Sequence, residues 1–112
     1  MKVEISLEKI NDITLVSLNG ELNLDNTHRV REAFKKILKQ RKAKVLLDFD
    51  NVPFIDSSGI ALLIEIVQAF GKSNGAMCLC HVNKKILSVF EITKVSKLFN
   101  IFDSHEEALR SF

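Results

Sequence analysis

Several features that define whole classes of protein are scarce or absent in this sequence of 112 residues. No apolar run is long enough to cross a membrane and no signal peptide opens the chain, so we expect a cytoplasmic protein without direct membrane insertion. The formal net charge is only +2, too small to indicate a nucleic-acid partner. The basic run at residues 35–44 has no interleaved aromatic residues. We interpret it as a solvated helix end, with a surface for an acidic protein as the alternative.

Cysteine is also scarce, because the chain has only Cys78 and Cys80. Alternation along a strand places both thiols on one face, at a separation that suits a disulfide poorly. The run C-L-C-H at residues 78–81 looks like part of a metal motif. However, alternation turns His81 to the opposite face, and the chain has no second pair of ligands. We therefore expect two buried core cysteines, no metal site and no cofactor.

The motifs of the common enzyme classes are missing as well. There is no G-x-S-x-G elbow, no Walker A loop and no G-x-G-x-x-G. His28, His81 and His105 fall in different predicted elements, which disfavours a Ser-His-Asp triad. Asp48 and Asp50 straddle a predicted strand end, where paired acids could hold a metal, but solubilising strand-end residues are the preferred interpretation. We predict a binding module and not an enzyme, with a small serine hydrolase as the weakest alternative.

The most informative stretch that is present lies in the middle of the chain. The strand predicted over residues 45–49 opens on a continuous apolar run, which is typical of a strand buried on both faces. Pro53 follows it and cannot donate to a central ladder. Asp56, Ser57 and Ser58 are then three candidate caps for a helix, and their residue types alone do not distinguish them.

The helix predicted from this turn to residue 70 is very apolar. At ~100° per residue its apolar side chains fill an arc of roughly 220°, whereas one sheet face needs a stripe of about 100°. Either flanking helices cover the rest of the arc, or part of it stays exposed for a partner. The serines at the turn also have two interpretations: they only cap the helix, or one hydroxyl is exposed at the helix N-terminus and accepts a phosphate.

Periodicity and capping residues predict the remaining elements. Alternating patterns indicate strands at residues 2–9 and 13–18, which we expect to pair as an antiparallel hairpin. Strand-helix-strand units follow and imply parallel pairing in a mixed sheet, with the helices mostly on one face. The next helix has Asn23 or Asp25 as its candidate N-cap and ends near residue 41. After the central strand and its helix, we expect a strand at 76–82, a helix capped by Asn83, and a helical turn or loop at 95–99. A short strand at 101–102 and a last helix, which opens with a capping box at Ser104, end the prediction.

Two short segments of the chain resemble the STAS family, the anti-sigma-factor antagonists. The first is G-E-L-N at residues 20–23, which is similar to the family's G-E-L-D loop. The second is I-D-S-S-G at residues 55–59, followed by an apolar helix as in the family's signature. The resemblance covers essentially the whole chain. It implies an α/β fold, with a single STAS-like domain over residues 1–112, a small mixed sheet of four to five strands and four to five helices.

The resemblance further implies a partner switch. An unphosphorylated antagonist binds an anti-sigma factor that is also a serine kinase, and this frees a sigma factor; phosphorylation by the kinase breaks the complex and a serine phosphatase restores it. By this resemblance Ser57 is the phosphoacceptor, and Asn23 stands where family members often carry Asp. The residues expected to bind the partner are Glu21, Asn23, Asp56, Ser57, Ser58 and Gly59. The alternative role is a non-switching STAS subunit that docks on a membrane transporter complex.

Overall fold

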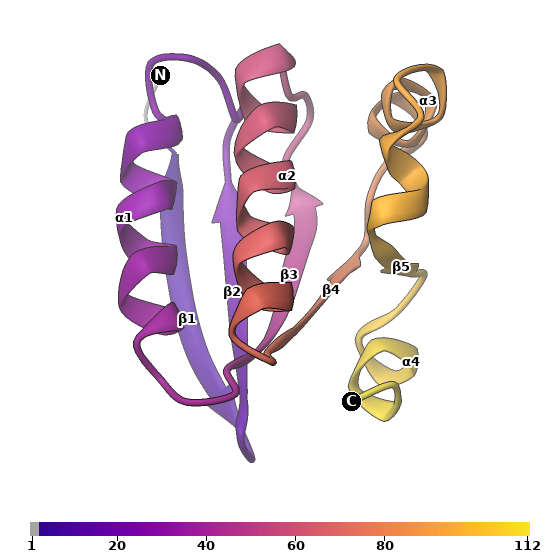
Figure 1. Ribbon diagram of the computed structural model, residues 1–112. Helices are drawn as coiled ribbons and strands as arrows, with labels where there is room; N and C mark the ends of the chain where they lie inside the picture. Colours follow the sequence, from indigo (N-terminus) through magenta and orange to yellow (C-terminus); the bar gives the residue numbers. More distant parts are fainter. Residues whose placement is uncertain (1–2) are drawn as a thin grey trace.

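The computed structural model describes residues 3–112, and five of its segments form a single β-sheet. The strands are β1 (Glu4–Ile10), β2 (Ile13–Asn19), β3 (Lys44–Asn51), β4 (Ala76–Cys80) and β5 (Asn100–Phe102). They lie in the order β1-β2-β3-β4-β5 (Figure 1), with β1 antiparallel to β2 and every later pair parallel. The predicted mixed sheet with an N-terminal hairpin is therefore confirmed. The first predicted strand included Lys2, which lies outside the described residues.

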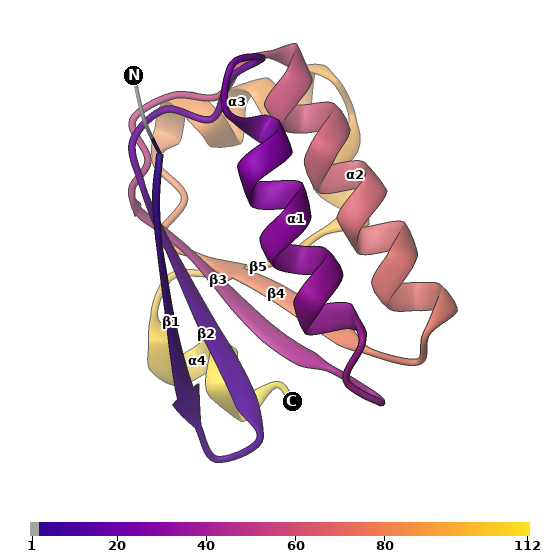
Figure 2. The same ribbon diagram turned by 90° about the vertical axis from the view of Figure 1, so that its left-hand side faces the viewer.

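Four α-helices and one 3₁₀-helix complete the described chain. They are α1 (Thr27–Leu38), α2 (Ser57–Lys72), α3 (Lys84–Ile92), η1 (Val95–Leu98) and α4 (His105–Arg110). Figure 2 shows α1 and α2 side by side over one face of the sheet, and α4 on the opposite face. The prediction that the helices lie mostly on one face is confirmed, and α4 is the element that departs from it.

The central strand β3 is buried on both faces, as its continuous apolar run predicts. Val45, Leu46 and Leu47 are all 0% exposed. Val45 and Leu47 belong to the main core under α1 and α2, whereas Leu46 belongs to a smaller core under α4. Cys78 and Cys80 are free, buried members of that smaller core, which confirms them as core cysteines.

The broad apolar arc of α2 is covered by neighbouring elements. α2 contacts α1, β4 and η1, so more than one face of the helix is packed. Phe70 of α2 meets Phe34 of α1 edge to face, with ring centroids 6.2 Å apart. Ile64, at one margin of the arc, and Val67, next to it, are half-buried and pack against the main core. The wide arc is therefore explained by flanking elements, and α2 offers no exposed apolar stripe for a partner.

Two of the predicted helix starts are confirmed and one is wrong. Asn83 Oδ1 accepts a hydrogen bond from the N–H of Ile86, and Ser104 Oγ accepts one from the N–H of Glu107. Both side chains cap their helices as expected. The start of α1, in contrast, lies beyond both residues proposed as its cap.

Helix α1 begins at Thr27, so neither Asn23 nor Asp25 is its N-cap. Asn26 occupies the cap position, but its side chain makes no capping hydrogen bond. That side chain is instead turned back into the preceding loop, where it bonds to backbone groups. The helix also ends at Leu38, earlier than expected, because residues 39–42 that follow it are exposed and polar and offer no apolar side chain to pack.

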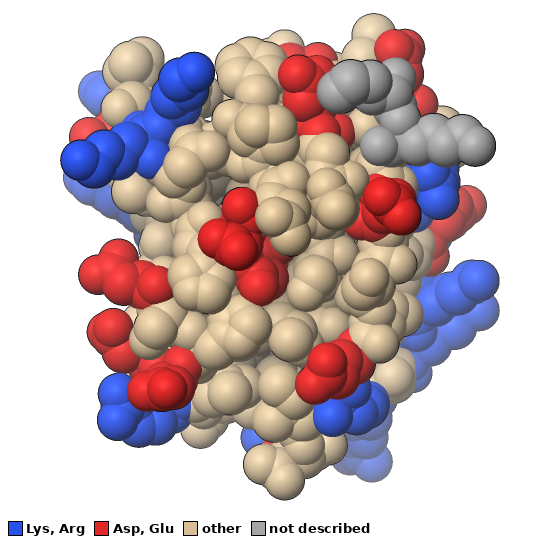
Figure 3. All heavy atoms as spheres, turned by 180° about the vertical axis from the view of Figure 1, so that it is seen from behind, with Lys and Arg blue, Asp and Glu red and all other residues tan. Residues whose placement is uncertain are grey.

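The face of the sheet opposite α1 and α2 is shown in Figure 3. For the described residues, acidic side chains are scattered over this face, and the lysines and arginines gather toward its margins. No helix among residues 3–112 combines the length and the apolar character that crossing a bilayer requires.

Candidate functional site

Two loops that are far apart in the chain meet at the start of α2. Leu22 and Ile55 form an isolated parallel bridge between the loop after β2 and the loop after β3. The N–H of Leu22 donates to the carbonyl of Phe54 at 3.1 Å, and the N–H of Asp56 donates to the carbonyl of Leu22, also at 3.1 Å. The two segments that carry the family resemblance therefore form one continuous surface, as expected for loops that follow adjacent strands.

Asp56 is the residue that caps α2, which the sequence alone left open. Its Oδ1 accepts a hydrogen bond from the N–H of Gly59 at 3.1 Å. Its Oδ2 accepts a second one from the N–H of Leu24 at 3.2 Å, in the other loop. One carboxylate thus satisfies a free amide of the first helical turn and ties the two loops together.

The two serines are consequently not needed as the cap. Ser57 is the first residue of α2 and is exposed, whereas Ser58 is the second residue and is half-buried. The N-terminus of a helix carries a partial positive charge, and its first N–H groups have no helical partner. An anionic group on Ser57 would therefore sit at the helix end that favours negative charge.

Gly59 holds the two loops together by having no side chain. A Cβ atom placed on it would lie 2.9 Å from the carbonyl oxygen of Leu22 and 3.2 Å from Cβ of Ile55. Because one of these atoms is backbone, any larger residue would force the loops apart. Gly59 is itself buried, so we assign it a structural part in the surface and not direct contact with a partner.

Asn26 organises the loop that contains Glu21 and Asn23. It is only 3% exposed. Its Oδ1 accepts from the N–H of Asn23 at 2.9 Å, and its Nδ2 donates to the carbonyl of Glu21 at 2.7 Å. Asn23 Oδ1 accepts from the N–H of Asp25 at 3.0 Å, an Asx-type turn. Sequence reasoning missed Asn26, although asparagine before a helix is a known turn former.

Two exposed apolar residues also lie on these loops and were not predicted. Leu24 is 73% exposed and Phe54 is 46% exposed. Leu24 follows Asn23 directly, and Phe54 is bonded through its carbonyl to Leu22. Apolar side chains held out on ordered backbone are suited to contact with another protein. Glu21 and Asn23 themselves are half-buried.

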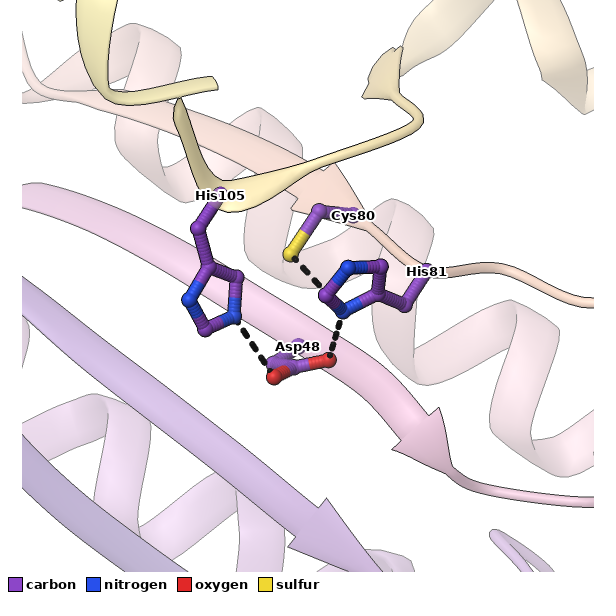
Figure 4. A group of neighbouring side chains, drawn as sticks. All are labelled: Asp48, Cys80, His81 and His105. Carbon is purple, nitrogen blue, oxygen red and sulfur yellow. Dashed lines mark hydrogen bonds and ion pairs between the residues drawn. The ribbon is translucent and has the colours of Figure 1, made fainter. Parts of the chain in front are cut away.

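A second group of polar side chains lies where β3, β4 and α4 meet (Figure 4). We call it the Asp48 cluster, and it consists of Asp48, Cys80, His81 and His105. Asp48 Oδ1 lies 3.1 Å from His81 Nδ1, and Asp48 Oδ2 lies 2.8 Å from His105 Nε2. The rings of His81 and His105 are stacked at a tilt, with centroids 5.0 Å apart.

The Asp48 cluster corrects two expectations from the sequence. His81 was expected on the face opposite both thiols, but its φ of 57° breaks the alternation, and its Nδ1 lies 4.0 Å from Cys80 Sγ. Asp48 was interpreted as a solubilising strand-end residue, but its side chain is only 13% exposed and binds two histidines. The histidines do lie in different elements, as expected, yet His81 and His105 are neighbours in space.

Two members of the Asp48 cluster have shifted acidities. Burial acts to raise the pKa of Asp48, but hydrogen bonds from the Asp50 N–H, His105 and His81 outweigh it and leave the pKa below its ordinary value. Burial raises the pKa of the Cys80 thiol to about 12, and the nearby carboxylates of Asp48 and Asp50 add to the effect. The carboxylate is thus held ionised, whereas the free thiol keeps its proton at neutral pH.

Comparisons of the sequence and of the fold show which known proteins this chain is similar to. The model of the STAS domain matches residues 4–108. The protein named anti-sigma F factor antagonist in Paenibacillus polymyxa is 26% identical over 110 residues, which are 97% of this chain and 94% of that protein. A crystal structure of a Thermotoga maritima protein superposes with a TM-score of 0.89 at 26% identity, covering 96% of this chain and 92% of that one.

The structure of a third similar protein is known both with and without phosphorylation. SpoIIAA of Bacillus has been solved in an unphosphorylated form, with a TM-score of 0.74 to this chain, and in a phosphorylated form, with a TM-score of 0.73. Both are 20% identical to this chain and cover 96% of it. At this identity the likeness establishes the shared fold alone.

Proposed function

The chain belongs to the STAS domain family, and from that premise we propose that it is an anti-sigma-factor antagonist. The proposal is supported by the name of the Paenibacillus polymyxa relative, which aligns over nearly the whole of both chains. The partner is an anti-sigma factor, and its docking surface is the joined pair of loops at the start of α2. Exposed Leu24 and Phe54 supply apolar contact there, and Glu21 and Asn23 border it.

Binding is controlled by phosphorylation of Ser57. The anti-sigma factor is itself a serine kinase, and it transfers the γ-phosphoryl group of ATP to Ser57 Oγ, with release of ADP and the hydroxyl proton. A serine phosphatase later removes the group by hydrolysis. One observation carries this proposal. Asp56 caps α2, so the hydroxyl of Ser57 is not used as the cap and is exposed for modification.

The local physics explains why the complex should fail while the fold survives. Phosphorylation adds about −1.5 to −2 charges. At the first residue of a helix of 16 residues, the fold accommodates this charge through the dipole and free N–H groups. Within an interface, however, the phosphate is desolvated beside the carboxylate of Asp56, and this like-charge contact opposes binding.

The proposal is tested by recovering the tagged chain from the cells in which it occurs. We expect it to bring down a protein of the histidine-kinase-like ATPase class and to carry one phosphate, mapped by mass spectrometry to Ser57. The Ser57→Ala variant should lose the phosphate and keep the partner. Ser88→Ala, at an exposed serine on α3, is the matched control and should retain both.

Three outcomes would contradict the proposal. Phosphate on Ser58 or on Thr27 would reject the assignment of Ser57. Recovery of a membrane transporter in place of an ATPase would favour the non-switching role of the domain. Hydrolysis of a generic ester that depends on Ser57 would favour a hydrolase.

A further inference from the structure

We propose that one Zn²⁺ ion binds at the Asp48 cluster, held by four protein side chains: Asp48, Cys80, His81 and His105. This site is separate from the surface at the start of α2 and does not depend on the function proposed for that surface. Its ligands come from three elements that the fold brings together on one side of the sheet. Asp48 lies in β3, Cys80 and His81 lie at and after the end of β4, and His105 is the first residue of α4.

The positions of the donor atoms fit a tetrahedral zinc centre. One ligand atom from each of the four side chains can be chosen so that all lie within 4.8 Å of one another. Tetrahedral bonds of about 2.0 Å to nitrogen and oxygen and about 2.3 Å to sulfur place neighbouring donors about 3.3–3.6 Å apart. Asp48 oxygens lie 3.1 Å and 2.8 Å from the two imidazole nitrogens, and Cys80 Sγ lies 4.0 Å from His81 Nδ1. Because no pair of the chosen donors is more than 4.8 Å apart, each pair needs to close by at most about 1.5 Å to reach bonding positions.

The donor set selects the metal. One thiolate, two imidazoles and one carboxylate are typical ligands of Zn²⁺, whereas Mg²⁺ and Ca²⁺ prefer oxygen alone. Four protein ligands complete a tetrahedral shell, which is the pattern of a structural zinc site and not of a catalytic one with an open position.

The partial burial of the cluster suits ion binding. Cys80 is 0% exposed and Asp48 is largely buried, so the inner half of the site is fixed by the core. The side chains of His81 and His105 are 31% and 36% exposed, which leaves a route for the ion to enter from solvent. His81 faces the cluster only because its backbone adopts φ 57°, a conformation that non-glycine residues rarely take.

Binding follows a balanced exchange. Zn²⁺ replaces the thiol proton of Cys80, which passes to solvent, and accepts lone pairs from His81 Nδ1, His105 Nε2 and one Asp48 oxygen. The hydrogen bonds that now join Asp48 to the imidazoles give way to metal bonds. The structural consequence is a cross-link between β3, β4 and α4. α4 has only six residues, too few to be stable without tertiary contacts, so this cross-link would fasten it to the sheet.

The test uses the complete chain with no histidine tag, stripped of metal by a chelator that is then removed. Titration with Zn²⁺ in a calorimeter should show one equivalent bound. Titration with Co²⁺ should give the absorption of a tetrahedral site together with a thiolate-to-cobalt charge-transfer band. His105→Gln should weaken Zn²⁺ binding by at least about 100-fold, because losing even an outer partner of a zinc ligand typically costs roughly 10–100-fold.

Matched controls separate the site from incidental binding. His28→Gln changes an exposed histidine of α1. Cys78→Ser changes the cysteine whose Sγ lies 3.3 Å from Ser111 Oγ and which is not a member of the cluster. Both should bind Zn²⁺ as the parent chain does, whereas Cys80→Ser should lose the charge-transfer band. Circular dichroism establishes that each variant is folded. A folded parent chain that gives no charge-transfer band, or that binds Zn²⁺ no more tightly than His105→Gln does, would overturn the proposal.

Discussion

Two aspartates stand at the centre of two different regions, and they bond to different kinds of partner. Asp56 accepts hydrogen bonds from two backbone N–H groups, those of Gly59 and Leu24. Asp48 lies against the imidazole rings of His81 and His105 as well as the N–H of Asp50. Asp56 bonds to backbone groups and so fixes the shape of a surface. Asp48 lies among side chains with nitrogen and sulfur donor atoms, and together they make a site that can bind an ion. We therefore expect the two regions to respond to different changes. The start of α2 should respond to changes in packing and charge, and the Asp48 cluster to the addition or removal of metal.

The largest effect is expected from a fixed charge at Ser57. Ser57→Asp should leave the fold nearly intact, with a loss of no more than about 1–2 kcal/mol in the free energy of unfolding, because an acid at a helix N-terminus is favourable. Affinity for the anti-sigma factor should fall roughly a thousandfold, equivalent to ~4 kcal/mol. Thermal melting and calorimetry measure the two quantities on one variant. A large drop in melting temperature with unchanged affinity would show that the serine is structural.

The next largest effect concerns the close contact at Gly59. Gly59→Ala should destabilise the protein by about 1–2 kcal/mol, because overpacking against the Leu22 carbonyl outweighs the gain in helix propensity. Gly71→Ala, in the same helix with nothing within 4 Å of the added Cβ, should instead stabilise it by about 0.5–1 kcal/mol. Urea unfolding gives both values. Equal changes in the two variants would mean that the loops do not approach as closely as described.

An effect of similar size, on binding and not on stability, is expected from the exposed apolar contact of the docking surface. Leu24→Ala should weaken binding of the anti-sigma factor by about 1–2 kcal/mol, the range of a contributing interface residue, without altering stability. Ile92→Ala is the control, because Ile92 is 80% exposed at the end of α3, outside the two loops. If both variants bind equally well, Leu24 is not part of the interface.

Removing the metal should change the stability of the whole chain least, because its effect is expected mainly in α4. With Zn²⁺ present, amide hydrogen exchange in α4 should be slower than in chelator-treated protein, since the ion fastens this short helix to the sheet. Exchange in the first turn of α2 should be the same in both samples, because its cap, Asp56, bonds to the N–H groups of Gly59 and Leu24 and is not a ligand of the ion. A uniform change across the chain would remove the distinction between the two regions.

The same contrast shows what the sequence could and could not predict. The apolar run of β3, the caps Asn83 and Ser104, and the pairing of the two motif loops all follow from local patterns or from strand adjacency, and each is confirmed. Asp56 could not be chosen over the serines from residue types, because all three are good caps. What distinguishes Asp56 is a contact with a distant part of the chain. The N–H of Leu24, 32 residues away, donates to its second carboxylate oxygen.

The Asp48 cluster lay beyond sequence reasoning for a different reason. A period of two residues places His81 opposite Cys80, and only a left-handed backbone at His81 reverses this. His105 is 57 residues from Asp48, and nothing in its local pattern indicates that α4 lies over the second face of the sheet. The positions of Asn26 and Leu24 were missed similarly, because burial of a polar residue and exposure of an apolar one are set by tertiary structure.

The central claim is that one phosphate on Ser57 controls binding of the anti-sigma factor. It is tested most directly by measuring the dissociation constant of the complex with the unphosphorylated protein and with the same protein after stoichiometric phosphorylation. The account predicts that affinity falls by roughly a thousandfold, or ~4 kcal/mol, on phosphorylation, while the circular dichroism spectrum stays the same. Equal dissociation constants for the two forms would contradict it.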